Sequence, residues 1–304
     1  MGKYRYESML LTTAALWGLT FPVMKYIGAN VDSVTFLAVR FILAAIVLAV
    51  ACRKHIGNIC PGMILPSIGV GLLYAFHSFL QLEGLRFTSA ANSGFITSTN
   101  VIFVPIFAFL FFGKKPNRKF LVGLLAIVIG FLFISGLVSV FPFGIYFTSL
   151  NFGDLLTLLC AVFTALYYVM FNKLSAKYDE VAVNLLHMAG AGLGMLPILL
   201  FYPNITCNLR DIYTVGGILY CAVLGSALSF LLLAKAQAQL SPAKVAVFCS
   251  LEAVFAAVFA AFIPGRDGSV EPITIATVVG GIMILIGVIR ISVDKGEVCN
   301  CAEN

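Results

Sequence analysis

The chain has 304 residues, of which 61% are hydrophobic and only 11% are charged. This composition and a mean hydropathy of +1.04 exclude an ordinary soluble domain, which needs a polar surface, and indicate a helical protein with many membrane spans. The formal net charge of +6 comes mostly from basic residues near the ends of apolar stretches, so it does not indicate a surface that binds nucleic acid.

Apolar stretches between charged residues and turn signals predict ten transmembrane helices, because a helix needs about 20 apolar residues to cross a bilayer. The connections between them are mostly short and leave no room for a soluble domain. The predicted fold class is therefore an all-α polytopic membrane protein. In chain order the predicted spans are 8–26, 33–51, 62–82, 90–112, 120–138, 152–172, 181–201, 212–233, 243–263 and 273–291.

The two halves of the sequence carry matching landmarks. Trp17 in the first span corresponds to Phe163 in the sixth, and Phe21 corresponds to Tyr167. Each half holds five predicted spans, and an odd number of spans turns the second copy upside down in the membrane. We therefore expect two inverted five-helix repeats at 1–138 and 152–293, an outer connecting loop at 139–151 and a cytoplasmic tail at 294–304.

Glycines in the fifth and tenth spans also correspond. Gly123 and Gly130 recur as Gly280 and Gly287, and the members of each pair are seven residues apart. This spacing places each pair on one face of its helix, where the missing side chains permit close helix packing in lipid. The sequence therefore predicts tight helix contacts along both spans.

Lysine and arginine residues gather on one side of the predicted membrane. If the N-terminus is cytoplasmic, most of them fall on the cytoplasmic side, and only Lys25, Arg86, Arg210 and Arg266 fall outside. This distribution follows the positive-inside rule. We therefore expect a multi-pass protein of the plasma (inner) membrane with both termini in the cytoplasm.

The motifs of enzymes and of metal or cofactor sites do not occur in this sequence. Its cysteines and three histidines lack the spacing of a metal site or of a disulfide framework. It has neither a glycine-rich phosphate loop nor the strained serine turn of the α/β-hydrolases. We therefore expect no enzyme activity and no cofactor, and any transport must draw on a gradient or on exchange.

Four segments together resemble one known family. They are AALWGLTFPVMKY (14–26), VTFLAVRFILAA (34–45), TSAANSGFITSTNVIFVPIFAFLFFGKK (88–115) and LSPAKVAVFCSLEAVFAAVFAAF (240–262). In this order and spacing they resemble the EamA-domain branch of the drug/metabolite transporter (DMT) superfamily. The resemblance implies ten helices in two inverted repeats, a cavity lined by the first, third, fourth, sixth, eighth and ninth spans, and alternating access. Where the ninth-span motif of the family usually reads Leu-Glu-Pro, this chain has Ala253 instead of the proline.

Glu252 is the sharpest candidate for a site residue. An ionisable group in the middle of a span is costly unless it faces a cavity or a partner. Its carboxylate could bind a cationic group of the substrate or carry a coupled proton, and Phe248, one turn away, adds an aromatic neighbour. The alternative is a packing role, in which Glu252 hydrogen-bonds a neighbouring helix. Its counterpart in the first repeat is Thr99.

The fourth span carries a polar stripe on an otherwise apolar helix. Ser93, Thr97 and Asn100 follow one another at helical spacing, so they share a face. Polar groups are unfavourable in lipid, and this face must therefore turn toward the bundle. We expect Thr97 and Asn100 to bind substrate, and the alternative is that they form hydrogen bonds between helices.

Aromatic residues at corresponding positions of the two repeats form a second candidate group. Trp17 and Phe21 share a helix face, as do Phe163 and Tyr167. Facing one another across the repeat axis, they could enclose a cationic or aromatic substrate through cation–π attraction. The alternative is that these rings only fill the core of the bundle.

Two further polar residues lie within spans. His77 shares a face with Tyr74 and Gln81, and it is a candidate for hydrogen bonding to substrate or for proton transfer, with packing as the alternative. Arg40, in the second span, corresponds to His187 in the seventh. We interpret Arg40 as a residue that holds helices together, with a role in gating as the alternative.

We predict a secondary active transporter that moves a small organic metabolite, an amino acid or related compound, by alternating access, with export as the direction and proton coupling through Glu252 as an option. The alternatives are uptake of a quaternary-ammonium or other organic cation, and a lipid flippase. The expected partners are a small-molecule substrate, the lipid bilayer and, where coupling holds, protons, but not nucleic acid. A monomer holds both repeats and suffices for a site. The predicted substrate-binding residues are Trp17, Phe21, His77, Thr97, Asn100, Phe163, Tyr167, Phe248 and Glu252.

Overall fold

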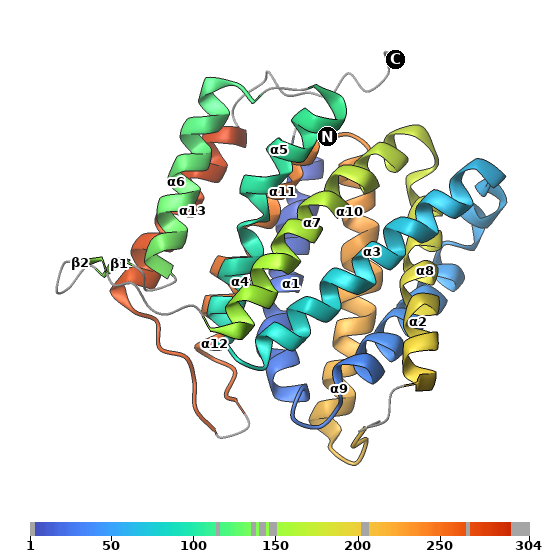
Figure 1. Ribbon diagram of the computed structural model, residues 1–304, viewed down its shortest axis with the longest axis horizontal. Helices are drawn as coiled ribbons and strands as arrows, with labels where there is room; N and C mark the ends of the chain where they lie inside the picture. The colour runs from blue at the N-terminus through green and yellow to red at the C-terminus, as the bar shows by residue number, and fades with distance from the viewer. Residues whose placement is uncertain are drawn as a thin grey trace.

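The computed structural model describes residues 4–113, 116–134, 138–139, 144–145, 151–201, 207–265 and 268–292. Within these residues the chain is almost entirely helical and forms one bundle (Figure 1). We call the end of the bundle at which the first helix begins the near end, and the opposite end the far end. The predicted tail at 294–304 and most of the predicted loop at 139–151 lie outside the described residues.

The first half of the chain contains α1 (Arg5–Ile27), α2 (Ser33–Ala51), η1 (Arg53–Asn58), α3 (Pro61–Leu85), α4 (Ala90–Ser98), α5 (Asn100–Phe112) and α6 (Arg118–Ile134). The second half contains α7 (Phe152–Lys177), α8 (Glu180–Phe201), α9 (Ile212–Ala222), the π-helical turn η2 (Val223–Leu228), α10 (Ser229–Gln237), α11 (Pro242–Cys249), α12 (Glu252–Ala260) and α13 (Ile275–Ser292). Between the halves, β1 (Val138–Ser139) pairs antiparallel with β2 (Gly144–Ile145).

The helices coincide with the predicted spans. Eight helical segments are long and apolar enough to cross a membrane, and α13 is a shorter apolar helix. The remaining predicted span, the fifth, corresponds to α6. Large apolar side chains on the outside of α13, such as Ile282 and Ile289, are exposed, as expected for a surface that contacts lipid. The predicted all-α polytopic fold is confirmed.

Contacts between the halves occur in exchanged pairs, which is the signature of a twofold repeat. Helix α3 packs on α7 and α8, and in the second half α9 packs on α1 and α2. Likewise α1 packs on α11 and α12, whereas α7 packs on α4 and α5. The helices α2 and α8 contact each other, as do α6 and α13, so each of these pairs lies across the repeat axis. The bundle is therefore built from two inverted five-helix repeats.

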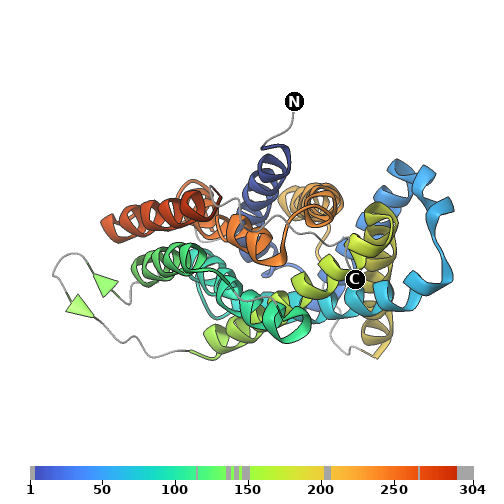
Figure 2. The same cartoon turned by 90° about the horizontal axis from the view of Figure 1, so that it is seen from above.

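The glycines of the fifth and tenth spans bring α6 and α13 into direct backbone contact. A Cβ atom added to Gly130 would lie 2.5 Å from the carbonyl oxygen of Gly280, and one added to Gly287 would lie 2.5 Å from that of Gly123. Any side chain at these positions would therefore push the two helices apart. The predicted tight contacts are confirmed, and Figure 2 shows the pair side by side at one edge of the bundle.

Two membrane crossings, the fourth and the ninth, are interrupted at corresponding places. The hydroxyl of Thr99 donates to the carbonyl oxygen of Ile96 at 2.6 Å, and that of Ser250 donates to Val247 at 2.7 Å. Such side-chain bonds compete with the helix ladder at both breaks. The ninth crossing breaks although Ala253 stands where the family motif has a proline.

After each break a new half-helix begins, and the first residues of these two half-helices show which positions of the two repeats correspond. Asn100 is the first residue of α5, and Glu252 is the first residue of α12. Asn100 and Glu252 therefore occupy equivalent positions at the starts of the two half-helices, whereas the alignment by sequence pairs Glu252 with Thr99.

Candidate functional site

A cavity with a volume of about 50 Å³ lies among the helices of both repeats. Small-molecule sites typically enclose about 300–1,000 Å³, so the cavity is too small for a metabolite in this conformation. Its lining comes from the first, third, fourth, sixth, eighth and ninth crossings, as the family resemblance implies, and also from α2. The lining residues are Trp17, Thr20, Phe21, Arg40, Tyr74, His77, Ser78, Gln81, Thr97, Thr164, Tyr167, Tyr168, Phe230 and Glu252.

Glu252 contributes a buried carboxylate to this cavity. Its side chain accepts a hydrogen bond from the hydroxyl of Ser98 at 3.2 Å, and the residue is only 4% exposed. Among the described residues no lysine, arginine or histidine lies within 4.0 Å of it. Because Glu252 begins α12, the positive end of the helix dipole favours its charge, which replaces part of the lost hydration.

Trp17 and Phe21 form one wall of the cavity on α1. The indole Nε1 of Trp17 donates to the carbonyl oxygen of Gly225 and to the hydroxyl of Ser229, both at 3.0 Å. The Trp17 ring also packs on Phe230 with centroids 5.1 Å apart, and Phe21 is fully buried. The hydrogen bonds and the ring contact fix the orientation of Trp17.

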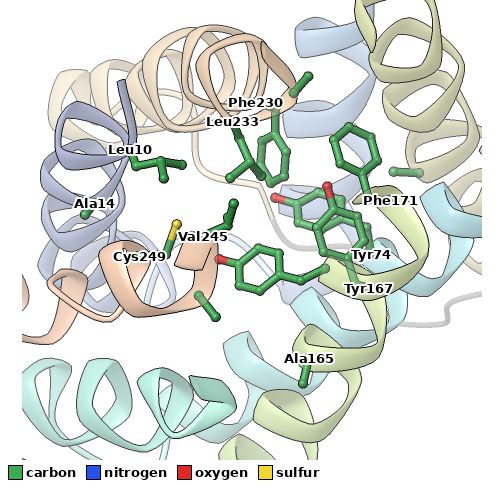
Figure 3. Close-up of a cluster of buried hydrophobic side chains, with 14 of the residues drawn as sticks. Leu10, Ala14, Tyr74, Ala165, Tyr167, Phe171, Phe230, Leu233, Val245 and Cys249 are labelled. Atoms are coloured by element: carbon green, nitrogen blue, oxygen red, sulfur yellow. The ribbon is translucent and has the colours of Figure 1, made fainter. Parts of the chain in front are cut away.

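A cluster of aromatic rings forms a second wall. The ring centroids of Tyr74 and Phe230 are 4.7 Å apart, and those of Tyr74 and Tyr167 are 5.5 Å apart. These rings come from α3, α10 and α7, so the cluster joins the two repeats (Figure 3). His187, the counterpart of Arg40, also contacts Tyr74 at 5.1 Å.

Polar groups without partners lie among these rings. Nδ1 of His77 is 3.4 Å from the hydroxyl of Thr164, but its Nε2 has no hydrogen-bond partner, and neither does the hydroxyl of Tyr167. The hydroxyl of Thr97 accepts a hydrogen bond from Nε2 of Gln81 at 3.1 Å. Buried polar atoms without partners are costly, so His77 and Tyr167 are suited to bind a polar ligand.

The structure brings together six of the predicted substrate-binding residues and separates three others from the cavity. Asn100 is buried, and its side chain donates to the carbonyl oxygen of Thr97 at 2.9 Å. Phe163 packs at 5.0 Å on Phe76, whose side chain is 48% exposed, and so lies toward the lipid surface. Phe248 is part of the hydrophobic core. The six that line the cavity are Trp17, Phe21, His77, Thr97, Tyr167 and Glu252.

Arg40 was not among the predicted substrate-binding residues, because its sequence position suggested a role in holding helices together. It lines the cavity, and its Nε donates to the hydroxyl of Ser226 at 2.8 Å. Its charge could have identified it as a cavity residue, because charged residues within a span face a cavity or a partner. Thr164 and Tyr168 were also missed, whereas Phe230 corresponds by sequence to His77 and lines the cavity together with it.

Comparisons with known proteins identify the family. The model of the EamA-like transporter family matches residues 5–136 and 151–293. The chain is 26% identical over 285 residues to an uncharacterized transporter of Archaeoglobus fulgidus, covering 93% of this chain and 84% of that protein. It is 25% identical over 297 residues to the uncharacterized transporter YetK of Bacillus subtilis, covering 94% and 87%.

A solved structure shares the fold. One crystal structure superimposes with a TM-score of 0.73 and covers 95% of this chain and 97% of that chain, at 16% sequence identity. Together with the apolar helices, these matches define a multi-pass membrane protein. The chain belongs to the EamA-like transporter family of the drug/metabolite transporter superfamily, and it is a membrane transporter.

Proposed function

We propose that this protein is a secondary active transporter that exports an amino acid or a related small metabolite across the plasma membrane. The observation that carries the proposal is the buried carboxylate of Glu252 in a cavity enclosed by both repeats. A carboxylate in this position can bind the ammonium group of an amino acid. The basic residues predicted to flank the spans support an orientation with both termini in the cytoplasm.

Transport by alternating access requires the cavity to open at one end of the bundle at a time. Two contacts between the repeats support this mechanism because each one closes one end. At the near end, Nζ of Lys244 on α11 donates to Glu7 on α1 at 2.8 Å. At the far end, Nδ2 of Asn92 on α4 donates to Asp154 on α7 at 2.9 Å. Each contact breaks when its end opens.

The surroundings of Glu252 support proton coupling. Its carboxylate has no cationic partner among the described residues, so its charge needs compensation whenever the cavity excludes water. Either a proton or the ammonium group of the substrate supplies this compensation. Exchange of one for the other would couple transport to the proton gradient.

Counterflow into proteoliposomes tests the function. The protein is reconstituted with each of a panel of amino acids, nucleosides and quaternary amines, and uptake of labelled solute is measured with and without a pH gradient. We expect exchange of at least one amino acid. Lipid scrambling without transport of any organic solute would favour a flippase and overturn the proposal.

Two variants separate proton coupling from substrate exchange. Glu252→Gln retains the shape of the side chain but not its charge. We expect it to abolish gradient-driven transport, while exchange of the amino acid continues with weaker binding because the ammonium group loses its charged partner. Glu83→Gln is the control, because Glu83 pairs with the exposed Arg86 at the far end, 3.2 Å away. If the pH dependence of Glu252→Gln equals that of the wild type, the proton is not coupled through this residue.

The alternative of organic-cation uptake has one observation in its favour. Glu252 and the aromatic walls around Trp17 and Tyr74 match the chemistry that recognises quaternary ammonium groups. In the same counterflow panel, transport of quaternary amines but not of amino acids would select this alternative.

A further inference from the structure

Arg40 places a permanent positive charge in the same cavity as Glu252. The residue is 4% exposed, and it lies in the middle of α2 among apolar helices. An arginine side chain stays protonated in proteins, so this charge cannot be removed by titration. The cavity therefore contains one buried cation and one buried anion, which come from different repeats.

The neighbours of Arg40 do not neutralise it. Its guanidinium donates to the hydroxyl of Ser226 at 2.8 Å, to the sulfur of Met24 at 3.4 Å and to the carbonyl oxygen of Gly225 at 3.4 Å. All three acceptors are uncharged, and the contact with the Gly225 carbonyl oxygen is long for a hydrogen bond. Among the described residues no carboxylate lies within 4.0 Å of the guanidinium.

Aromatic rings compensate only part of the charge. The guanidinium carbon lies 5.9 Å from the centre of the Phe36 ring and 5.7 Å from that of Phe41. Such contacts contribute less than a buried ion pair with good geometry. An uncompensated buried charge is strongly unfavourable, and an apolar residue would hold the helices together without that cost. The charge is therefore explained best by an anion that enters the cavity.

We infer that Arg40 binds the carboxylate group of the substrate and thereby restricts transport to zwitterions. This inference rests on the proposed function, in which Glu252 binds the ammonium group. A zwitterion brings one opposite charge to each residue, so both buried charges are neutralised together when the cavity closes. The planar guanidinium matches a carboxylate with two parallel hydrogen bonds. A cation without a carboxylate would leave Arg40 uncompensated.

Three solutes of similar shape test the inference. L-leucine carries both charges, isoamylamine lacks the carboxylate, and 4-methylpentanoate lacks the ammonium group. A second series consists of L-phenylalanine, 2-phenylethylamine and 3-phenylpropanoate. Counterflow of each solute is measured for the wild type, Arg40→Gln, Arg40→Lys and Glu252→Gln. We expect the wild type to transport only the zwitterion of a series.

The two charge-removing variants should change the selectivity in opposite directions. In Arg40→Gln we expect transport of the zwitterion to fall at least tenfold and transport of the amine to appear. In Glu252→Gln we expect the carboxylate to become a substrate. Arg40→Lys keeps the charge but not the planar fork, so it should retain zwitterion selectivity with weaker binding. It also keeps the test decisive if Arg40→Gln does not fold.

The possible negative results distinguish failure of the Arg40 inference from failure of the proposed transporter function. Loss of zwitterion transport in Arg40→Gln without a gain of amine transport, together with a lower melting temperature, would overturn the inference and leave Arg40 as a packing residue. Transport of amines by the wild type would overturn the inference as well, while the proposed transporter function would stand. Scrambling of lipids without transport of any solute would overturn the proposed function itself.

Discussion

The contacts that close the two ends of the bundle occupy equivalent positions but differ in charge. Glu7 and Asp154 are the third residues of α1 and α7, and Lys244 and Asn92 are the third residues of α11 and α4. At the near end the contact is an ion pair at 2.8 Å, whereas at the far end an amide donates to a carboxylate at 2.9 Å. The two repeats therefore share the position of this contact but differ in the charge of the donor.

The far end compensates for its weaker pair with hydrogen bonds to backbone atoms. The carboxylate of Glu271 accepts from the backbone N–H groups of Ala90 and Ala91 at 2.8 and 3.1 Å. Nζ of Lys25 donates to the carbonyl oxygen of Leu85 at 2.8 Å. At the near end, the side chains of Glu7 and Lys244 are only 12% and 11% exposed, so water screens their pair poorly. The near end therefore depends more on a single charged contact.

The largest expected effect comes from removing one partner of the near-end pair. Lys244→Met leaves the carboxylate of Glu7 unpaired in a poorly hydrated place, which should cost about 2–3 kcal/mol of unfolding free energy. Asn92→Leu at the far end removes a hydrogen bond between an amide and a carboxylate and should cost about 1 kcal/mol. Thermal unfolding of the purified variants in detergent measures both losses.

A double variant shows whether charge causes the difference. Glu7→Leu combined with Lys244→Met removes both charges, so it should recover most of the stability that Lys244→Met loses. If Lys244→Met and Asn92→Leu were equally destabilised, the charge of the near-end pair would contribute nothing and the comparison would fail.

A smaller effect is expected from making the two ends alike. Asn92→Lys gives Asp154 a cationic partner and reproduces the near-end chemistry at the far end. A stronger far-end contact should slow opening, and a barrier raised by about 1.4 kcal/mol lowers the transport rate about tenfold. The rate of counterflow measures the change, and Asn92→Gln, which keeps the amide, is the control. A rate equal to that of the wild type would mean that this contact does not limit opening.

Sequence patterns predicted the scaffold because lipid imposes simple rules on it. Hydropathy located the spans, and the spacing of Gly123 and Gly130 predicted close packing. The orientation of single side chains was harder, because lipid and the bundle interior are both apolar and hydropathy does not separate them. The cavity face of α7 runs through Thr164 and Tyr167, and Phe163 lies to one side of it.

Arg40 shows a second limit of prediction from sequence. The sequence reveals a charge in the second span, but its neighbours Gly225 and Ser226 come from the π-helical turn η2, far away along the chain. A single π-helical turn has no regular pattern of hydrophobic residues from which it could be predicted. For the same reason the absence of a carboxylate near Arg40, among the described residues, became visible only in three dimensions.

The smallest effect concerns a second contact at the near end, between η1 and the start of α8. Asp179 caps α8, and its Oδ2 lies 3.0 Å from Nδ1 of His55 and accepts from Asn58 at 2.6 Å. Burial raises the pKa of the Asp179 carboxyl, but hydrogen bonds from His55, the Ala182 N–H and Asn58 outweigh it, so the pKa lies below its ordinary value of 3.8.

A carboxyl group with a lowered pKa stabilises the folded protein above its ordinary pKa, and this contribution is lost as the pH falls through the lowered value. Asp179→Asn should therefore lower the unfolding free energy by less than about 1 kcal/mol near neutral pH. It should also make the melting temperature depend less on pH below pH 4. Asp32→Asn, at the equivalent cap of α2, is the matched control at the far end. Melting curves recorded between pH 7 and pH 3 compare the two caps. If Asp179→Asn kept the acid dependence of the wild type, another carboxyl group would be responsible for it.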